Sequence, residues 1–262
     1  MGIVNVTPDS FSGDGRILAE EAIAHALTQL EQGADILDIG AQSTRPGHTP
    51  LDAEEERRRL LPVVRGVRER APGAVISIDT YNAGVFRDAH EAGGDILNSI
   101  WGLDEALLDA AGVCDAAVVV MHNKTAASYE RGVVDEVLAH LEEQAARAVR
   151  AGIAAERVVL DPGIGFGKLP EHNIALLASL NRLVALGFPT LVGASRKSTI
   201  GALTGRSVGE RLFGTAAAVA LAAAAGVDIV RVHDVGPMRD VVRVADAVKR
   251  GWRPEGWEAG PA

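Results

Sequence analysis

Short apolar runs alternate with longer amphipathic segments along the whole chain. The short runs are rich in Val and Ile, which is typical of buried strands. Eight such runs span residues 2–4, 35–38, 75–78, 95–97, 116–121, 158–160, 190–192 and 229–232. Between them, hydrophobic positions recur with a helical period, for example over residues 18–32, 53–70, 133–151 and 241–249. The pattern therefore predicts strands that alternate with helices.

Five glycines come shortly before predicted strands, where the end of a helix uses left-handed backbone. They are Gly33, Gly93, Gly152, Gly187 and Gly226. Strands separated by helices pair in parallel, through right-handed crossovers. Eight such units fit a closed barrel better than an open sheet, so we predict an α/β fold, a single (β/α)8 TIM barrel.

No linker rich in Pro or Ser divides the chain, so we assign residues 1–262 to one domain. Residues 250–262 are expected to form a loosely attached tail. The first predicted strand begins at Gly2, so either no segment closes the amino-terminal end of the barrel or the chain begins late.

Composition narrows the class of protein. Aromatic residues make up only 4%, and the net charge is -9 with no basic run, which argues against a nucleic-acid partner. The longest apolar run, residues 216–225, is too short to span a bilayer, so no membrane partner is expected. The single cysteine, Cys114, cannot form an intramolecular disulfide, and we predict a cytoplasmic protein.

Polar groups stand where each predicted strand ends. Active sites of (β/α)8 barrels are built at the carboxyl ends of the strands, so these groups are expected to converge on one rim. They are Asn5, Asp38, Asp79, Asn98, Met121-His122, Asp161, Ser195-Arg196-Lys197 and Arg231-Val232-His233. The sequence thus predicts a site at this rim, built largely from short Asp and Asn side chains.

Several of these residues also have a purely structural interpretation. An Asp at a strand end is often a helix cap or turn former, and Asp38, with Gly40 close behind, fits this best. His122 fits a buried core histidine equally well. The glycine-rich residues 161–168 lack the Gly-Lys-Ser/Thr ending of a phosphate-binding loop, and no helix opens directly from them. We interpret them as a loop that brings backbone close to a flat ligand.

Six segments together resemble the signatures of dihydropteroate synthases, and they occur in that family's order over nearly the whole chain. They are residues 5–12, 38–47, 76–80, 161–167, 195–198 and 231–235. The resemblance implies a magnesium-dependent transferase of folate biosynthesis and a target of sulfonamides. Such an enzyme joins 6-hydroxymethyl-7,8-dihydropterin diphosphate to para-aminobenzoate and releases pyrophosphate. The apolar surface expected of the last helices also makes a homodimer a reasonable expectation.

The resemblance also implies roles for single residues. By similarity, the pterin would be held by Asp79, Asn98, Asp161 and Lys197. The diphosphate would be held by Asn5, Arg231 and His233, with Asn5 also near the magnesium ion. The remaining substrate-binding residues would be Thr44, Arg45, Met121, Phe166 and Ser195, and the catalytic ones Lys197, Arg231 and His233.

The chemistry of these side chains agrees with such roles. Carboxylates accept neighbouring N–H groups in a forked way, and a pterin edge presents such donors. Negative charge builds up on the diphosphate as it departs. Arg231, His233 and a magnesium ion are suitable groups to stabilise that charge. A dissociative path, in which the weakly nucleophilic aniline attacks second, needs no strong base.

Four positions depart from the family pattern: Gln42 for Glu, Ser99 for Asp, Asn82 for Lys, and Asp14, which is displaced by one residue. Three alternatives therefore stay open. One is a catalytically idle paralogue that only binds pterins. A second is a pterin-dependent methyltransferase of the same superfamily, which has no use for Arg231 and His233 as diphosphate ligands. The third, a generic phosphate-binding barrel, ranks last because it favours glycine-rich loops after the last two strands.

Overall fold

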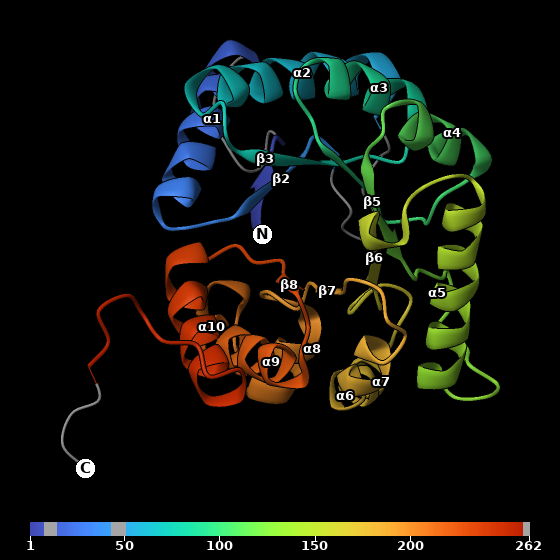
Figure 1. Cartoon of the computed structure of the whole chain (residues 1–262), viewed down its shortest axis with the longest axis vertical. Coiled ribbons are helices and arrows are strands. Elements are labelled where there is room, and N and C mark those ends of the chain that lie inside the picture. The colour runs from blue at the N-terminus through green and yellow to red at the C-terminus, as the bar shows by residue number, and fades with distance from the viewer. Residues whose placement is uncertain (8–14, 43–50, 259–262) are drawn as a thin grey trace.

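Parallel strands form the centre of the molecule and helices surround them (Figure 1). The computed structural model of the chain describes residues 1–7, 15–42 and 51–258. Its strands are β1 (Gly2–Asn5), β2 (Ile36–Gly40), β3 (Val75–Asp79), β4 (Ile96–Ser99), β5 (Ala117–Met121), β6 (Val158–Asp161), β7 (Leu191–Val192) and β8 (Ile229–Val230). Strands β1 to β6 pair in chain order, and β7 pairs with β8.

Two isolated bridges close the ring of strands. Leu160 pairs with Thr190 between β6 and the start of β7, and Gly2 pairs with Val232 between β1 and the end of β8. The result is a closed parallel barrel, which confirms the predicted (β/α)8 fold. Each predicted strand coincides with an observed one and differs from it by two residues or fewer at either end.

Helices connect the strands and pack on the outside of the barrel. They are α1 (Gly15–Glu31), α2 (Ala53–Arg70), α3 (Ala83–Glu91), α4 (Glu105–Val113), α5 (Val133–Arg150), α6 (Pro170–Ala178), α7 (Leu180–Val184), α8 (Ser198–Thr204), α9 (Leu212–Ala225) and α10 (Val235–Lys249). The side chains of Asp52, Asn82 and Asp104 accept backbone N–H groups at the starts of α2, α3 and α4.

The five glycines predicted to end helices all have positive φ, between +81° at Gly187 and +118° at Gly93, as that prediction requires. The start of the last helix was predicted wrongly. Helix α10 begins at Val235 rather than at residue 241, because Pro237 lies in its first turn, where a proline is tolerated.

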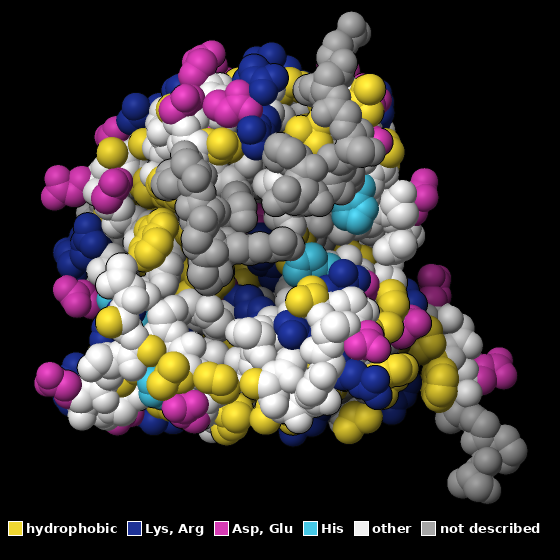
Figure 2. Space-filling model, turned by 180° about the vertical axis from the view of Figure 1, so that it is seen from behind, with side chains coloured by type: hydrophobic (Ala, Val, Ile, Leu, Met, Phe, Trp, Pro, Cys, Tyr) yellow, Lys and Arg dark blue, Asp and Glu magenta, His cyan; other side chains and the backbone are white. Residues whose placement is uncertain are grey.

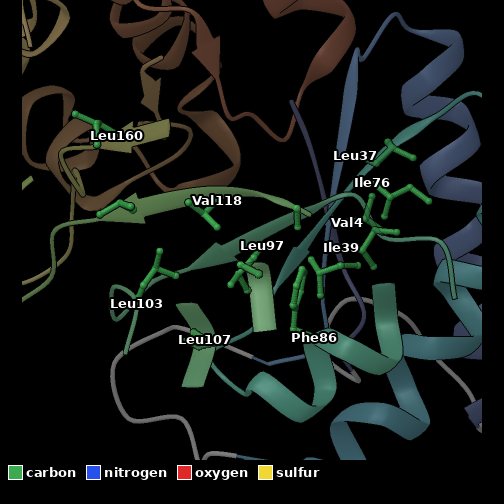
Figure 3. Packing of buried hydrophobic residues seen from close by; sticks show 14 of the residues in the cluster. Val4, Leu37, Ile39, Ile76, Phe86, Leu97, Leu103, Leu107, Val118 and Leu160 are labelled. Atoms are coloured by element: carbon green, nitrogen blue, oxygen red, sulfur yellow. The ribbon is translucent and has the colours of Figure 1, made fainter. Parts of the chain in front are cut away.

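Alternation along each strand divides the side chains into two sets. Outward positions such as Leu37, Ile76 and Leu97 are fully buried against the helices and belong to one large apolar cluster. Figure 3 shows these side chains near Phe86 of α3. Inward positions carry a second, smaller apolar cluster at the amino-terminal end of the barrel. It consists of Met1, Ile96, Val119, Val159 and Leu191.

This inner cluster forms the floor of the barrel. On β4 and β6 the polar inward residue lies farther along the strand than the apolar residue of the floor, as Asn98 follows Ile96 and Asp161 follows Val159. The barrel is therefore apolar at its amino-terminal end and polar toward its carboxyl-terminal rim.

The segment after α10 leads away from the barrel (Figure 1). Its residues 251–258 are exposed, although the Trp252 backbone N–H donates to the Asp246 carbonyl at 3.2 Å. Among the helices of the described residues, none is long and apolar enough to cross a membrane.

Candidate active site

The inward side chains at the carboxyl ends of the strands line one end of the barrel. Figure 2 shows this end, with a hollow whose wall carries Lys or Arg and His side chains. Strand pairing places the end residues of neighbouring strands at the same level along the barrel axis. Asn5 pairs with Gly40, Gly40 with Asp79, and Asp79 with Asn98. On the other side of the ring, Met121 pairs with Asp161. The predicted convergence of these positions is thus present.

Asp38 lies at the centre of this polar layer. Its carboxylate is 1% exposed and accepts from Ser77 Oγ at 2.6 Å and from Asn98 Nδ2 at 3.1 Å and 3.2 Å. Arg231 Nε donates to it at 2.6 Å. The interpretation of Asp38 as a helix cap or turn former was therefore wrong, because it points into the barrel and orients a side chain from each of three other strands or strand ends.

Arg231 bridges two carboxylates. Besides Asp38, its guanidinium donates to Asp79 through Nη2 at 3.2 Å. Burial raises the pKa of Asp79 to about 7, and the negative charge of Asp38 adds to this effect, while Arg231 opposes it. The two acids and one base thus form a buried, hydrogen-bonded ion cluster from β2, β3 and the end of β8.

Two contacts join the ends of β7 and β8. Ser195 Oγ lies 2.9 Å from His233 Nδ1, and the His233 backbone N–H donates to the same oxygen at 3.2 Å. Arg196 has a φ of +55°, and its guanidinium makes a forked pair with Asp234 at 2.9 Å and 2.5 Å. Burial, reinforced by Arg231, lowers the pKa of His233 to about 4, so its imidazole is neutral at pH 7.

Asp161 ends β6, and Lys197 follows β7, the strand that pairs with β8. Asp161 Oδ1 accepts the Gly163 N–H at 2.7 Å, and burial raises the pKa of its carboxyl above the usual range. The Lys197 ammonium donates to the Ile164 carbonyl and lies 4.3 Å from the centre of the Phe166 ring. Burial lowers the pKa of Lys197 to about 7, although Asp161 opposes the shift.

The glycine-rich segment between β6 and α6 lies tightly against the end of β5. Gly163, Gly165 and Gly167 have φ values of +68°, +84° and +58°. A Cβ on Gly163 would stand 2.0 Å from the His122 carbonyl oxygen, and one on Gly167 would stand 2.2 Å from that of Lys124. Glycine is therefore required at both positions for the loop to approach the neighbouring backbone.

Other predicted site residues are placed less completely. Asn5 ends β1, and Met121 is buried at the end of β5. Thr44 and Arg45 lie outside the residues that the structure describes, as do residues 8–14 with Asp14. The contributions of the loops after β1 and β2 therefore stay predictions.

Two departures from the family pattern have visible surroundings. Gln42 donates from Nε2 to Glu56 Oε2 at 3.0 Å and accepts from the Tyr81 hydroxyl at 2.7 Å. Glu56 is fully buried, and burial raises the pKa of its carboxyl. An amide at position 42 gives this buried acid a donor, where a second carboxylate would add repulsion. Asn82 caps α3 with its side chain, whereas nothing in the structure explains Ser99.

Sequence reasoning placed Asp38 at the rim without assigning it a role, and it missed two further contributors, Ser77 and Lys168. Asp38 and Ser77 share the inward parity of Gly40 and Asp79, so strict alternation from the strand ends points to both. Lys168 directly follows the glycine-rich loop, and its ammonium contacts His122 Nδ1 at 2.9 Å. No sequence pattern pointed to that contact.

The arrangement offers two distinct binding chemistries. Asp161 and Asn98 supply acceptors in a largely buried place, where hydrogen bonds to a flat heterocycle would be strong. Arg231 and His233, which follow β8 and are two residues apart, supply donors suited to an anionic group. The rim can thus hold a ligand that is polar and flat at one end and anionic at the other.

Replacing Asp38 by alanine is expected to lower the free energy of unfolding by about 3–5 kcal/mol, because a buried guanidinium loses its main partner. The matched control is Asp109→Ala, which breaks an exposed pair with Arg87 whose side chains are 65% and 45% exposed. This control is expected to cost no more than about 1 kcal/mol. Urea unfolding measures both, and equal losses would contradict the central place of Asp38.

Comparison with known proteins agrees with this geometry. The family described as "Pterin binding enzyme" matches residues 1–233. The dihydropteroate synthase of Bacillus subtilis is 39% identical over 251 residues, which cover 95% of this chain and 87% of that protein. That of Haemophilus influenzae is 40% identical, covering 94% of this chain and 92% of its own.

Solved structures agree as well. A Clostridium difficile dihydropteroate synthase in the presence of pteroic acid superposes with a TM-score of 0.92 at 43% identity, covering 95% of this chain and 96% of that one. The Thermus thermophilus enzyme in complex with 6HMPPP gives a TM-score of 0.84 at 45% identity, covering 95% and 93%. The chain therefore belongs to the dihydropteroate synthase family of pterin-binding enzymes.

Proposed function

We propose that the rim residues of this chain divide the work of dihydropteroate synthesis between a pterin-binding side and a diphosphate-binding side. The enzymes of this family are transferases of folate biosynthesis. They join 6-hydroxymethyl-7,8-dihydropterin diphosphate to para-aminobenzoate, giving 7,8-dihydropteroate and pyrophosphate. The observation that carries the assignment of roles is that Asp161 and Lys197 stand at the ends of β6 and β7, with Phe166 against Lys197, whereas Arg231 and His233 stand just after β8.

The pterin would lie against Asp161 and Asn98. The Asn98 amide nitrogen donates to Asp38, which leaves the Asn98 carbonyl oxygen as an acceptor for a ring N–H. Asp161 would accept a forked pair of donors, and Lys197 would donate to a ring acceptor and offset the carboxylate charge. Asp79, Met121 and Phe166 complete this side as predicted. One solved relative holds 4-aminobenzoate, which is one of the two substrates, and another holds 7,8-dihydropteroate, which is the product.

The diphosphate would lie against Arg231 and His233. Arg231 already donates to Asp38 and Asp79, so its position is fixed before an anion binds. His233 is neutral at pH 7 and, because Ser195 faces its Nδ1, its Nε2 is the ring nitrogen left to contact a leaving group. These fixed donors would stabilise the negative charge that develops on the departing diphosphate.

The chemistry of the reacting groups indicates the order in which the bonds break and form. The attacking aniline is a weak nucleophile and the reaction needs no covalent intermediate on the protein, so we assign the contact of 2.9 Å between Ser195 Oγ and His233 Nδ1 to holding the His233 ring. We therefore favour a dissociative path, in which the C–O bond to diphosphate breaks first and the aniline nitrogen attacks the pterin methylene afterwards. The released aniline proton then passes to solvent or to the departing pyrophosphate, and the pterin methylene gains a C–N bond in place of the C–O bond.

A magnesium ion fits this site only together with the substrate. The described residues contain no group of three or more His, Cys, Asp or Glu side chains that could hold a metal. Asn5 offers one amide oxygen at the end of β1, beside β8. Magnesium commonly takes one or two protein oxygens and completes its shell with phosphates and water. Asn5 would hold such an ion, which would supply further positive charge to the diphosphate.

Pyrophosphate release by the purified protein tests this function. Release is expected only when the pterin diphosphate, para-aminobenzoate and magnesium are all present, with dihydropteroate as the second product. Chelation of magnesium should abolish release, and restoring the ion should recover it. Binding of the pterin diphosphate without release under all conditions would instead favour the idle paralogue. The methyltransferase alternative loses support from Arg231 and His233, for which it has no use.

A homodimer is a second proposal, and its support is an exposed apolar surface on the last helices. Leu203, Phe213, Leu221, Val244 and Val248 of α8, α9 and α10 are 64%, 85%, 60%, 66% and 77% exposed. Apolar side chains gathered on neighbouring helices are typical of an interface between subunits. The cytoplasmic location of the protein stays a prediction, which rests on the single cysteine.

Phe213→Glu is expected to convert the dimer into monomers, because a carboxylate would be buried in an apolar interface. Size-exclusion chromatography with light scattering measures the mass. Val113→Glu is the matched control, since Val113 is 75% exposed at the end of α4, on another helix of the barrel. A wild-type protein of monomer mass, or dimers that persist in Phe213→Glu, would contradict this interface.

A further inference from the structure

Lys168 is a half-buried cation that the proposed roles leave unused. It follows the loop formed by Gly163 to Gly167 and is only partly exposed. Burial lowers the pKa of its ammonium to about 8, and the nearby Asp161 carboxylate opposes the shift. In the described part of the chain Lys168 forms no ion pair with a carboxylate. Its ammonium must therefore be held by hydrogen bonds to other groups.

Those contacts join the glycine-rich loop to the end of β5. Lys168 Nζ lies 2.9 Å from His122 Nδ1 and donates to the His122 carbonyl at 3.2 Å. It also donates to the Phe166 carbonyl at 2.9 Å. His122 is 3% exposed, and burial, with Lys168 next, lowers its pKa to about 3, so its neutral ring accepts from the ammonium. One side chain therefore fastens two loops together.

Two further side chains donate to carbonyls of the loop. The Tyr129 hydroxyl donates to the Gly167 carbonyl at 2.8 Å, and Lys197 donates to the Ile164 carbonyl. With Lys168 on the Phe166 carbonyl, three carbonyls of this short loop are held by side chains from outside it. The glycines there have positive φ, so the backbone by itself favours other conformations as well. The observed shape depends on these donors.

The shape of this loop positions the residues on the proposed pterin side of the rim. The Phe166 ring meets the Lys197 ammonium at 4.3 Å, and the Gly163 N–H is held by Asp161 at 2.7 Å. Lys168 holds the carbonyl of Phe166 between these two contacts. Its charge also favours the ionised form of Asp161. By contrast, Lys168 contacts neither Arg231 nor His233, which stand on β8 and its end.

We infer that Lys168 is a positioning residue for the pterin: it fixes the Gly163–Gly167 loop against His122, so that Phe166, Lys197 and Asp161 stand ready for the ring. This inference rests on the proposed function. Lys168 does not touch the reacting atoms, and it acts through the loop. Its loss should therefore weaken pterin binding and leave the binding of pyrophosphate unchanged.

The test measures two affinities by calorimetry in wild type, Lys168→Met and Lys249→Met. The probes are 6-hydroxymethylpterin, which lacks the diphosphate, and inorganic pyrophosphate with magnesium. Lys168→Met is expected to weaken pterin binding about tenfold, as the loss of a charged hydrogen-bonding group implies, with pyrophosphate affinity unchanged. Lys249 is exposed on α10, and its replacement should change neither affinity.

Kinetics and a second variant complete the test. In Lys168→Met the KM for the pterin diphosphate should rise, with a smaller change in kcat than in KM. Lys168→Gln keeps a polar group at this position, so it decides the matter if Lys168→Met does not fold. Unchanged pterin affinity, or an equal loss of both affinities, overturns the inference. A wild-type protein that binds neither probe refutes the proposed function instead.

Discussion

The site depends on one buried interaction, the hydrogen-bonded ion pair between Asp38 and Arg231. Asp38 is fully enclosed and joins Ser77, Asn98 and Arg231 within a single polar layer. A charge in this position is costly unless every partner is present, so each of the three holds the others in place. The cluster thereby fixes both the acceptor offered by Asn98 and the donors offered by Arg231 before any ligand arrives.

The barrel makes this cluster possible because its strands separate apolar from polar positions. Outward side chains form the core with the helices, while inward ones change from the apolar floor at Ile96 and Val159 to Asn98 and Asp161 two residues later. Burial at the polar rim raises the pKa of Asp79 and lowers that of Lys197, in both cases to about 7. Neighbouring charges compensate one another there instead of being solvated.

Sequence predicted the barrel and most of the rim, since short apolar runs rich in Val and Ile, helical segments and strand-end polar residues are all local signals. It placed Asp38 at the rim but left its role open, because an acid followed closely by Gly40 has the same local pattern as a turn, and only its partners from other strands reveal its role. Lys168 was missed for the same reason: its contacts come from His122, 46 residues away. The start of α10 failed because Pro237 conceals a helical first turn.

The central claim is that the rim binds the two halves of the pterin diphosphate separately. Crossed binding of 6-hydroxymethylpterin and of magnesium pyrophosphate to Asp161→Asn and His233→Ala tests it most directly. We expect Asp161→Asn to lose affinity for the pterin and retain it for pyrophosphate, and His233→Ala to show the reverse. If both variants lost both ligands equally, or if each lost the opposite ligand, the assignment of the two sides would be contradicted.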